Sequence, residues 1–170
     1  EETEHGWFQA HAYQFEAGTS TFIVECTEST YQAHGLEEAS ETESIKFCEQ
    51  LFAKHLGGQS LMVNGKHLRG SRWLAFHRVS NARWHHGNVV LLGDSAHTAH
   101  FSIGSGTRLG FEDAVDLTHS LHEHEDLETA LTEYEKARRV AVLRIQSAAR
   151  NSTEWFENVS RYVHMPHKQF

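Results

Sequence analysis

The segment of residues 88–115 constrains the fold more than any other part of the chain. It begins with the strand-like run 88–92, which is apolar from its second residue onward and suits a buried position. The run leads into Gly93-Asp94 and then into a loop of small residues with two further glycines. From Thr107 onward the apolar residues recur at helical spacing. The sequence therefore predicts a strand, a glycine-containing loop and a helix in immediate succession.

This succession suits a ligand that joins a polyhydroxyl chain to a flat ring. Asp94 lies at the end of the strand, where a carboxylate can accept hydrogen bonds from sugar-like hydroxyl groups. Gly104 and Gly106 let a planar group approach the backbone because neither carries a Cβ. The helix start near Thr107 offers unpaired N–H groups and a partial positive charge to an acceptor oxygen. A flavin is such a ligand: a polyhydroxyl chain joined to a flat ring that carries an acceptor oxygen.

The rest of the pattern predicts an α+β fold. Two β-rich runs, Trp7–Phe15 and Ser20–Cys26, flank a short glycine-containing turn and predict a hairpin. A capping box at Ser40 begins a helix that the glycine pair Gly57-Gly58 ends. We expect a loop or weak strand at 61–70 and a strand at 73–79.

Beyond residue 107 the pattern predicts long helices. Two apolar stripes at helical spacing predict the faces that pack on the core. They consist of Phe111, Ala114, Val115, Thr118 and Leu121, and of Leu127, Leu131, Tyr134, Ala141, Ile145 and Ala148. Basic residues on the second helix are interpreted as a solvated face balanced by Glu133 and Glu135; they are Lys136, Arg138, Arg139, Arg144 and Arg150.

Charge and composition exclude several classes of partner. The net charge of -8, from 15 Lys+Arg against 23 Asp+Glu, argues against binding to nucleic acid. No apolar run approaches the roughly 18 residues that a membrane span needs. The two cysteines, Cys26 and Cys48, form no disulfide framework, and Cys48 is predicted to be a buried apolar residue. We therefore expect a cytoplasmic protein.

The segment of residues 88–115 resembles the second FAD-binding motif of the flavoprotein aromatic hydroxylases, the p-hydroxybenzoate hydroxylase-like group A monooxygenases. In that family a buried strand leads into Gly-Asp, small residues with a His, a glycine-containing loop and a helix with Asp-Ala, here Asp113-Ala114. The resemblance implies a substrate-side mixed sheet with helices, joined to the C-terminal FAD-binding strand, loop and helix of an FAD/NAD(P)-binding fold. The variant His-Phe-Ser-Ile-Gly-Ser-Gly-Thr at 100–107 is similar to a narrower branch, the monooxygenase part of 2-aminobenzoyl-CoA monooxygenase/reductase and salicyloyl-CoA 5-hydroxylase. Most family members have Pro at the position of His100-Phe101, and many have Asn at the position of Arg108.

The resemblance assigns a role to single residues. The Asp94 carboxylate would bind the ribityl chain, the loop 104–106 would lie along the isoalloxazine ring, and the Thr107 and Arg108 amides would hold its O2 and N1 edge. The predicted cofactor-binding residues are Asp94, Ile103, Gly104, Ser105, Gly106, Thr107 and Arg108. The predicted catalytic residues are His100 and Phe101: Phe101 would form a wall near the site of oxygen transfer, and His100 would donate a hydrogen bond there.

The implied activity is hydroxylation of an aromatic substrate with FAD as cofactor, NADH or NADPH as co-substrate, and O2. An aryl-CoA thioester such as 2-aminobenzoyl-CoA or salicyloyl-CoA is the first choice of substrate. A free aromatic acid or a tryptophan-like indole is the alternative. Among the residues of the expected strand, Phe76, His77 and Arg78 are candidates to face the substrate, with their direction left open.

The N-terminal Gly-x-Gly-x-x-Gly fingerprint of the family, which holds the FAD pyrophosphate and adenosine, is absent from these residues. We therefore expect the C-terminal half of a catalytic region, whose partner is the missing N-terminal Rossmann segment of the same polypeptide. Residues 1–85 are predicted to form the substrate-side sheet and helix, and residues 86–170 the FAD-binding strand, loop and long helices. Alone, the chain is expected to bind FAD weakly and to be inactive.

The sequence also admits four competing interpretations. The 15 histidines include His119 and His122 at helical spacing, but no third placed ligand completes a set, so no metal is predicted. Ser95 lacks the flanking glycines of a hydrolase nucleophile. His97 is predicted to be a structural hydrogen-bonding residue rather than a base. A non-catalytic α+β binding module is the remaining alternative.

Overall fold

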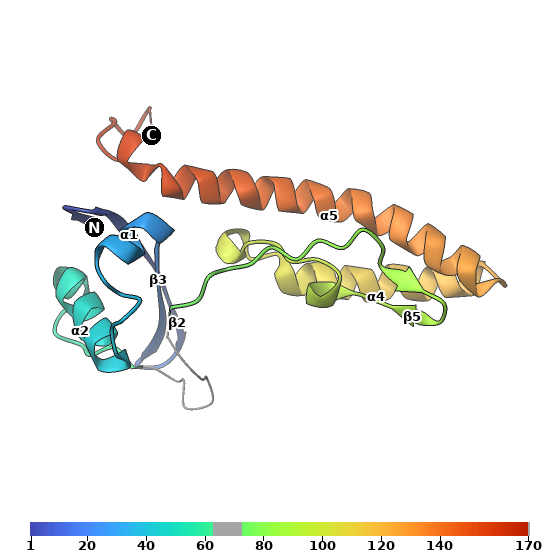
Figure 1. Ribbon diagram of the computed structural model, residues 1–170, viewed down its shortest axis with the longest axis horizontal. Coiled ribbons are helices and arrows are strands. Elements are labelled where there is room, and N and C mark those ends of the chain that lie inside the picture. Colours follow the sequence, from blue (N-terminus) through green and yellow to red (C-terminus); the bar gives the residue numbers. More distant parts are fainter. Residues whose placement is uncertain (63–72, 170) are drawn as a thin grey trace. The chain divides into compact units, whose positions relative to one another are not determined.

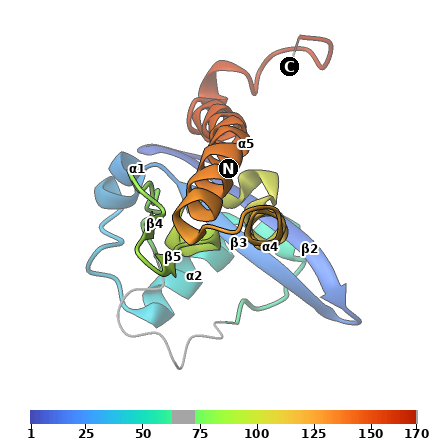
Figure 2. The same ribbon diagram turned by 90° about the vertical axis from the view of Figure 1, so that its right-hand side faces the viewer.

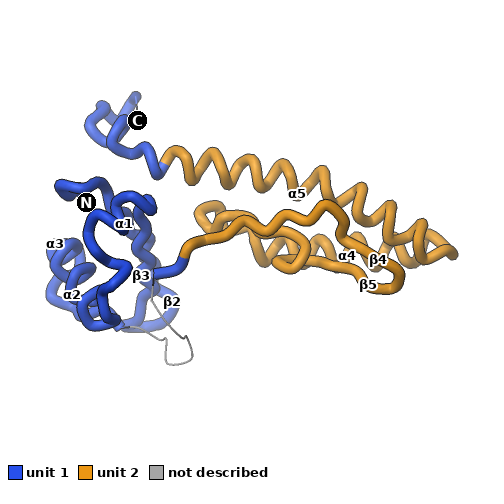
Figure 3. The backbone as a smooth tube through the Cα atoms, viewed as in Figure 1, with its two compact units in different colours: residues 1–74, 156–170 blue, residues 75–155 orange. Residues whose placement is uncertain are grey.

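The computed structural model describes residues 1–62 and 73–169 of the chain. These residues form two compact units, which are coloured separately in Figure 3. Unit 1 comprises Glu1–Leu74 together with Phe156–Phe170, and unit 2 comprises Ala75–Trp155. Helices and sheets are both present, as the α+β prediction requires. The predicted division into a substrate-side part, residues 1–85, and an FAD-binding part, residues 86–170, stays a prediction.

Unit 1 is built on a three-stranded antiparallel sheet in the order β1-β2-β3. Its strands are β1 (Glu2–Thr3), β2 (Gly6–Glu16) and β3 (Thr19–Cys26). Strands β2 and β3 pair from Phe8 with Cys26 to Glu16 with Thr19, across a turn in which Gly18 has a positive φ of 76°. The predicted hairpin is therefore confirmed.

Short helices follow the hairpin in unit 1, and Figure 1 labels α1 and α2 among them. They are α1 (Glu28–Ala33), α2 (Glu41–Leu51) and α3 (Ala53–Leu56). Both hydrogen bonds of the predicted capping box at Ser40 are present, and Gly57 ends α3 in the left-handed conformation. The buried residues Phe8, Leu36 and Phe52 form the core of this unit. Cys48 on α2 is buried as predicted. The ends of the predicted helix are thus confirmed, although its regular hydrogen bonding is interrupted at Phe52.

Two predicted strands differ from the structure. Residues 73–79 contain no strand, although Val79 exchanges hydrogen bonds with Thr98 and the next residue forms an isolated bridge. The run 88–92 contributes only β5 (Val89–Val90), which pairs with β4 (His85–His86). Val89 is 62% exposed, so the buried position predicted for this run is wrong in the described chain. No second strand among the described residues covers its free edge. Most of the expected loop at 61–70 lies outside the described residues.

Unit 2 is dominated by α4 (Gly106–Glu123) and α5 (Leu127–Glu157), which run side by side in Figure 1 and Figure 2. Short 3-10 turns flank them: η1 (Gly93–Ser95), η2 (Phe101–Ile103) and η3 (Val159–Arg161), the last of which belongs to unit 1. The core between α4, α5 and the preceding loops contains Trp84, Ala96, Leu109, Tyr134 and Val142. No helix in the described ranges has both the length and the apolar content that crossing a bilayer requires.

The face of α4 that packs inward is not the predicted one. Phe111 is 70% exposed, and Val115 and Leu121 are exposed too, whereas Leu109, Asp113 and Ser120 are buried. The predicted α4 stripe is therefore wrong for this chain, because polar contacts made by Asp113 and Ser120 fix the inner face. On α5 the prediction holds for Leu131 and Tyr134 and fails for Leu127 and Ala148, which are exposed.

Candidate functional site

The proposed site begins at the turn η1, which carries Asp94. Gly93 opens this turn with a φ of 58°, a left-handed conformation that costs residues with a Cβ about 1–2 kcal/mol. The Asp94 side chain is exposed and has no hydrogen bond or ion pair with any described residue. An unpaired carboxylate on a fixed turn is available to accept hydrogen bonds from a ligand.

The start of α4 supplies hydrogen-bond donors to the same site. The first backbone bond at this end of the helix runs from the Leu109 N–H to the Ser105 carbonyl. The N–H groups of Gly106, Thr107 and Arg108 therefore have no acceptor among the described residues, and the Ser105 side chain does not cap them. No acidic residue lies in the first turn, so the partial positive charge of the helix end is not neutralised locally.

The backbone of the loop before α4 is open at its two glycines. Gly104 has a φ of 61°, and a methyl group built on Gly104 or on Gly106 would meet no atom within 4 Å. Ile103 instead packs its side chain against the core of unit 2, so it can offer a ligand only its backbone. The Ser105 hydroxyl donates to the Ile103 carbonyl at 3.3 Å, and the Arg108 side chain bonds Glu112.

His100 and Phe101 lie in an aromatic group with Phe76. The His100 and Phe101 rings stack at 4.5 Å, and Phe76 meets them edge-on at 5.1 and 5.6 Å. The Ser102 amide donates to His100 Nδ1 at 3.3 Å, so the neutral His100 ring carries its proton on Nε2. This places a donor on the far side of the ring, as the role predicted for His100 requires.

A cavity of about 160 Å³ opens beside this aromatic group. Phe76 and Arg78 line one wall, and the α5 residues Ala149 and Arg150 line another. Of the three candidates on the segment before residue 80, Phe76 and Arg78 thus face this cavity, whereas His77 is not among its lining residues. Arg78 has no hydrogen bond or ion pair among the described residues, and Arg150 bonds Glu154.

A buried polar group lies behind the turn, and the contacts that join its members are not predicted by the sequence pattern. Asp113 on α4 has no exposed surface, and its Oδ2 accepts hydrogen bonds from the Gly93 amide and from His97 Nε2, both at 2.8 Å. Its Oδ1 accepts from Arg138 Nε, also at 2.8 Å. Burial raises the pKa of Asp113, but these hydrogen bonds outweigh burial and lower the pKa overall.

Two interpretations of single residues can be judged from this group. His97 is 3% exposed and hydrogen-bonded to Asp113, which confirms its predicted structural role. Arg138 is 4% exposed, so its assignment to a solvated helix face is wrong. The position of Arg138 in the helix could have indicated its burial. It lies seven residues after Leu131 and four after Tyr134, which places it on the inner face of α5.

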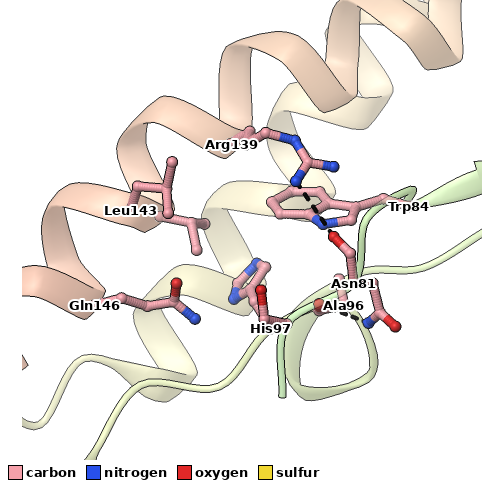
Figure 4. A pocket seen from close by; sticks show the side chains of 9 residues that line it. Asn81, Trp84, Ala96, His97, Arg139, Leu143 and Gln146 are labelled. Carbon is pink, nitrogen blue, oxygen red and sulfur yellow. Dashed lines mark hydrogen bonds between the residues drawn. The ribbon is translucent and has the colours of Figure 1, made fainter. Parts of the chain in front are cut away.

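The His97 ring is fixed by its other neighbours (Figure 4). It packs against the indole of Trp84, with ring centroids 4.9 Å apart, and Arg139 lies over the opposite side of that indole at 5.3 Å. Arg139 also donates to the Asn81 carbonyl, and the Asn81 amide donates to the Ala96 carbonyl. The orientation of His97 toward Asp113 is therefore determined by packing on several sides.

Comparison with known proteins shows the family of the chain. Residues 14–149 match the family described as FAD binding domain. Salicyloyl-CoA 5-hydroxylase of Streptomyces sp is 41% identical over 94% of this chain and 32% of its own length. Protodeoxyviolaceinate monooxygenase of Chromobacterium violaceum is 37% identical over 96% of this chain and 43% of its own length. The chain thus spans 32% to 43% of the length of these relatives.

A solved structure shows the same fold. PqsL, a probable FAD-dependent monooxygenase from Pseudomonas aeruginosa, superposes with a TM-score of 0.60 over 92% of this chain and 43% of its own, at 22% identity. A second structure of PqsL, in complex with 2-aminobenzoylacetate, superposes with a TM-score of 0.55 over 84% of this chain and 39% of its own, also at 22% identity. Because the family match covers most of the sequence, this chain belongs to the FAD binding domain family.

Proposed function

We propose that this chain is the part of a flavin-dependent monooxygenase that holds the isoalloxazine and ribityl end of FAD. The observation that carries the proposal is the combination of the unpaired Asp94 carboxylate with the free amides of Gly106–Arg108. The open space at Gly104 and Gly106 supports the approach of a planar ring to the backbone, because neither residue places a Cβ between ring and backbone. These residues supply the acceptor, the donors and the slot that the flavin end of FAD needs.

Each residue has a separate task in this proposal. Asp94 accepts hydrogen bonds from ribityl hydroxyl groups, and the Thr107 and Arg108 amides donate to the acceptor edge of the ring. The positive end of α4 favours negative charge on that edge. When bound, FAD supplies the redox chemistry that takes electrons from NADH or NADPH and oxygen from O2. Phe101 excludes water from the reacting face, and His100 Nε2 donates a hydrogen bond there.

The proposed substrate is an aromatic acyl thioester, with an aryl-CoA as first choice. The cavity beside His100 resembles in size the roughly 150 Å³ apolar cavities that bind benzene in other proteins. Arg78 and Arg150 at its walls suit a carbonyl or anionic group attached to the ring. The identity to an enzyme named for salicyloyl-CoA supports the thioester, and the PqsL complex with 2-aminobenzoylacetate supports an aromatic substrate more broadly.

The partner of this chain within the complete enzyme is proposed to be an N-terminal segment that holds the rest of FAD. The relatives are two to three times longer than the part matched here. The exposed apolar residues Val89, Phe111 and Val115 offer a surface for it, and β5 has a free edge among the described residues. The isolated chain is then expected to bind FAD weakly.

A titration with FAD tests the cofactor site. In the full-length protein, Asp94→Asn should weaken FAD binding about 10- to 100-fold, because it removes a charged acceptor. Glu123→Gln changes an exposed acid at the other end of α4 and should leave the affinity within about twofold. Equal affinities of Asp94→Asn and the wild type would refute the assignment of Asp94, and a full-length protein without flavin would favour the non-catalytic binding module.

A comparison of substrates tests the chemistry. NADH and NADPH consumption and product formation are measured with salicyloyl-CoA, 2-aminobenzoyl-CoA, the free acids and tryptophan. Turnover of a CoA thioester with a KM that Arg78→Gln raises about tenfold, at similar kcat, supports the proposal. Turnover of a free acid or an indole alone would establish the alternative substrate class.

A further inference from the structure

We propose that Asp113 is a positioning residue for FAD, acting through the Gly93-Asp94 turn rather than by contact with the cofactor. This inference rests on the proposed cofactor site. Asp113 is buried behind that site, and its carboxylate holds the Gly93 amide directly. It thereby ties the residue before Asp94 to the helix whose first amides form the other half of the site.

The hydrogen bonds of Asp113 require a carboxylate. The Gly93 amide, His97 and Arg138 each present an N–H to it at 2.8 Å, and an ionised carboxylate has only acceptors to offer. An asparagine of the same shape would place its NH2 group against at least one of these donors. Asp113→Asn therefore breaks the arrangement without changing the volume of the side chain.

The position of Asp113 explains why the effect reaches the ligand. Asp113 lies five residues after Arg108 on one continuous helix, so its carboxylate has a fixed distance to the free amides at the helix start. On the other side, Gly93 approaches α4 closely enough that a methyl group on Gly110 would lie 3.6 Å from the Gly93 Cα. Loss of the Gly93 hydrogen bond would free the turn and change the distance between Asp94 and those amides.

The remaining contacts keep Asp113 ionised and in place. Arg138 neutralises its charge and also reaches Glu112 at 3.2 Å and Asp116 at 3.3 Å. His97 reaches it from the segment after η1, with its ring held by Trp84. The turn is thus anchored to Asp113 at its first residue and again at His97, and Asp94 lies between the two anchors.

The test compares Asp113→Asn with Asp116→Asn in the full-length protein. Asp116 shares the Arg138 contact but is half-exposed and touches neither Gly93 nor His97. We expect Asp113→Asn to raise the Kd for FAD about 10- to 100-fold and to alter the visible circular dichroism of the bound flavin at saturating FAD. Asp116→Asn should change the Kd by less than about threefold and leave the spectrum as in the wild type.

A structural role without positioning would lower the yield of folded Asp113→Asn but leave the Kd and the spectrum of the folded fraction unchanged, and that result would overturn the inference. If the variant does not fold, His97 decides the question. Gln at position 97 can place a donor where Nε2 lies, and Leu cannot, so the Kd should rise for His97→Leu and return toward wild type for His97→Gln. Equal Kd values for these two variants would also overturn it. A wild-type protein that binds no FAD would refute the proposed function as well.

Discussion

Replacement of Arg138 by Met is expected to destabilise the protein by an amount that depends on pH. Arg138 is 4% exposed and contributes the charge that balances the fully buried Asp113. Met keeps most of the apolar stem of Arg and removes the guanidinium. The Asp113 carboxylate then keeps its hydrogen bonds from Gly93 and His97 but loses its permanent counter-charge.

The expected loss of stability follows from two costs. Breaking a buried ion pair by removing one partner typically costs about 3–5 kcal/mol. The variant can escape part of this cost by protonating Asp113, which for a carboxyl of ordinary pKa near 3.9 costs about 4 kcal/mol at pH 7. Because two hydrogen bonds to Asp113 survive, we expect a loss of about 3 kcal/mol at pH 7. For a cooperative unit of 150–250 residues, this corresponds to a fall in Tm of about 6–12 °C.

The pH dependence has a definite sign. In the wild type the pKa of Asp113 is lowered, so its ionised form stabilises the fold above the unfolded pKa, and this contribution is lost as the pH falls through the folded pKa. In Arg138→Met the pKa of the same carboxyl is expected to rise, because only the hydrogen bonds from His97 and Gly93 remain to offset burial once the guanidinium is gone. Protonation at pH 5 would cost only about 1.5 kcal/mol, so the difference in stability from the wild type should be roughly halved between pH 7 and pH 5.

Thermal unfolding of the full-length apoprotein at pH 5, 6, 7 and 8 measures this difference. Arg144→Met is the matched control, because Arg144 lies on the same helix, is exposed and should change stability by less than about 0.5 kcal/mol. The double variant Asp113→Asn/Arg138→Met removes both charges and should be more stable than the two single losses added together. A loss below about 1 kcal/mol, or one that is the same at every pH, would refute the reasoning.

Three further predictions concern backbone, cap and thiols. Gly93→Ala should lower Tm, because a residue with a Cβ pays about 1–2 kcal/mol in the left-handed conformation of Gly93. Gly110→Ala should instead raise Tm slightly. Its methyl group would meet the Gly93 Cα at an ordinary 3.6 Å, and Ala favours the helix over Gly by up to about 1 kcal/mol. Ser40→Ala removes the capping box and should cost about 1 kcal/mol, seen as faster amide exchange in α2; unchanged exchange would contradict it. Burial raises the pKa of Cys26 and of Cys48 to about 11, so at pH 8 both should be alkylated more than about 100-fold more slowly than in urea, and equal rates would argue against their burial.

Local signals in the sequence predicted those elements whose shape is decided by a few neighbouring residues. The capping box at Ser40 and the left-handed glycine at Gly57 lie where the pattern places them, because both act through backbone hydrogen bonds within one turn. The strand expected at 73–79 failed because a strand needs a paired neighbour, which no local pattern supplies. The apolar run ending at Leu92 is predicted to be buried, but a local pattern also cannot show which segment covers it. Among the described residues the free edge of β5 is uncovered, and Val89 is exposed.

In the site, too, residues with a local chemical signal are predictable from the sequence and residues that meet only through packing are not. Asp94, Gly104 and Gly106 were recognised as ligand-binding candidates because their chemistry is visible one residue at a time. Asp113 was seen only as part of a motif, and Arg138 was assigned to solvent, because the pair is separated by 25 residues and meets only when α4 and α5 pack. A charged residue in phase with the apolar positions of a helix is the one local sign of such a pair.

The proposed site combines exposed ligand-facing groups with buried contacts behind them. The groups proposed to touch FAD are the exposed Asp94 carboxylate on the turn η1 and the amides at a helix start that no described side chain caps. Such groups bind well only if their mutual distance is set in advance, since ordering them on binding would cost free energy. The buried contacts among Gly93, His97 and Asp113 set that distance from behind the site. In the positioning role proposed for Asp113, these hydrogen bonds would contribute to cofactor affinity without any contact with the cofactor, and the open face of the loop would be left to the ligand.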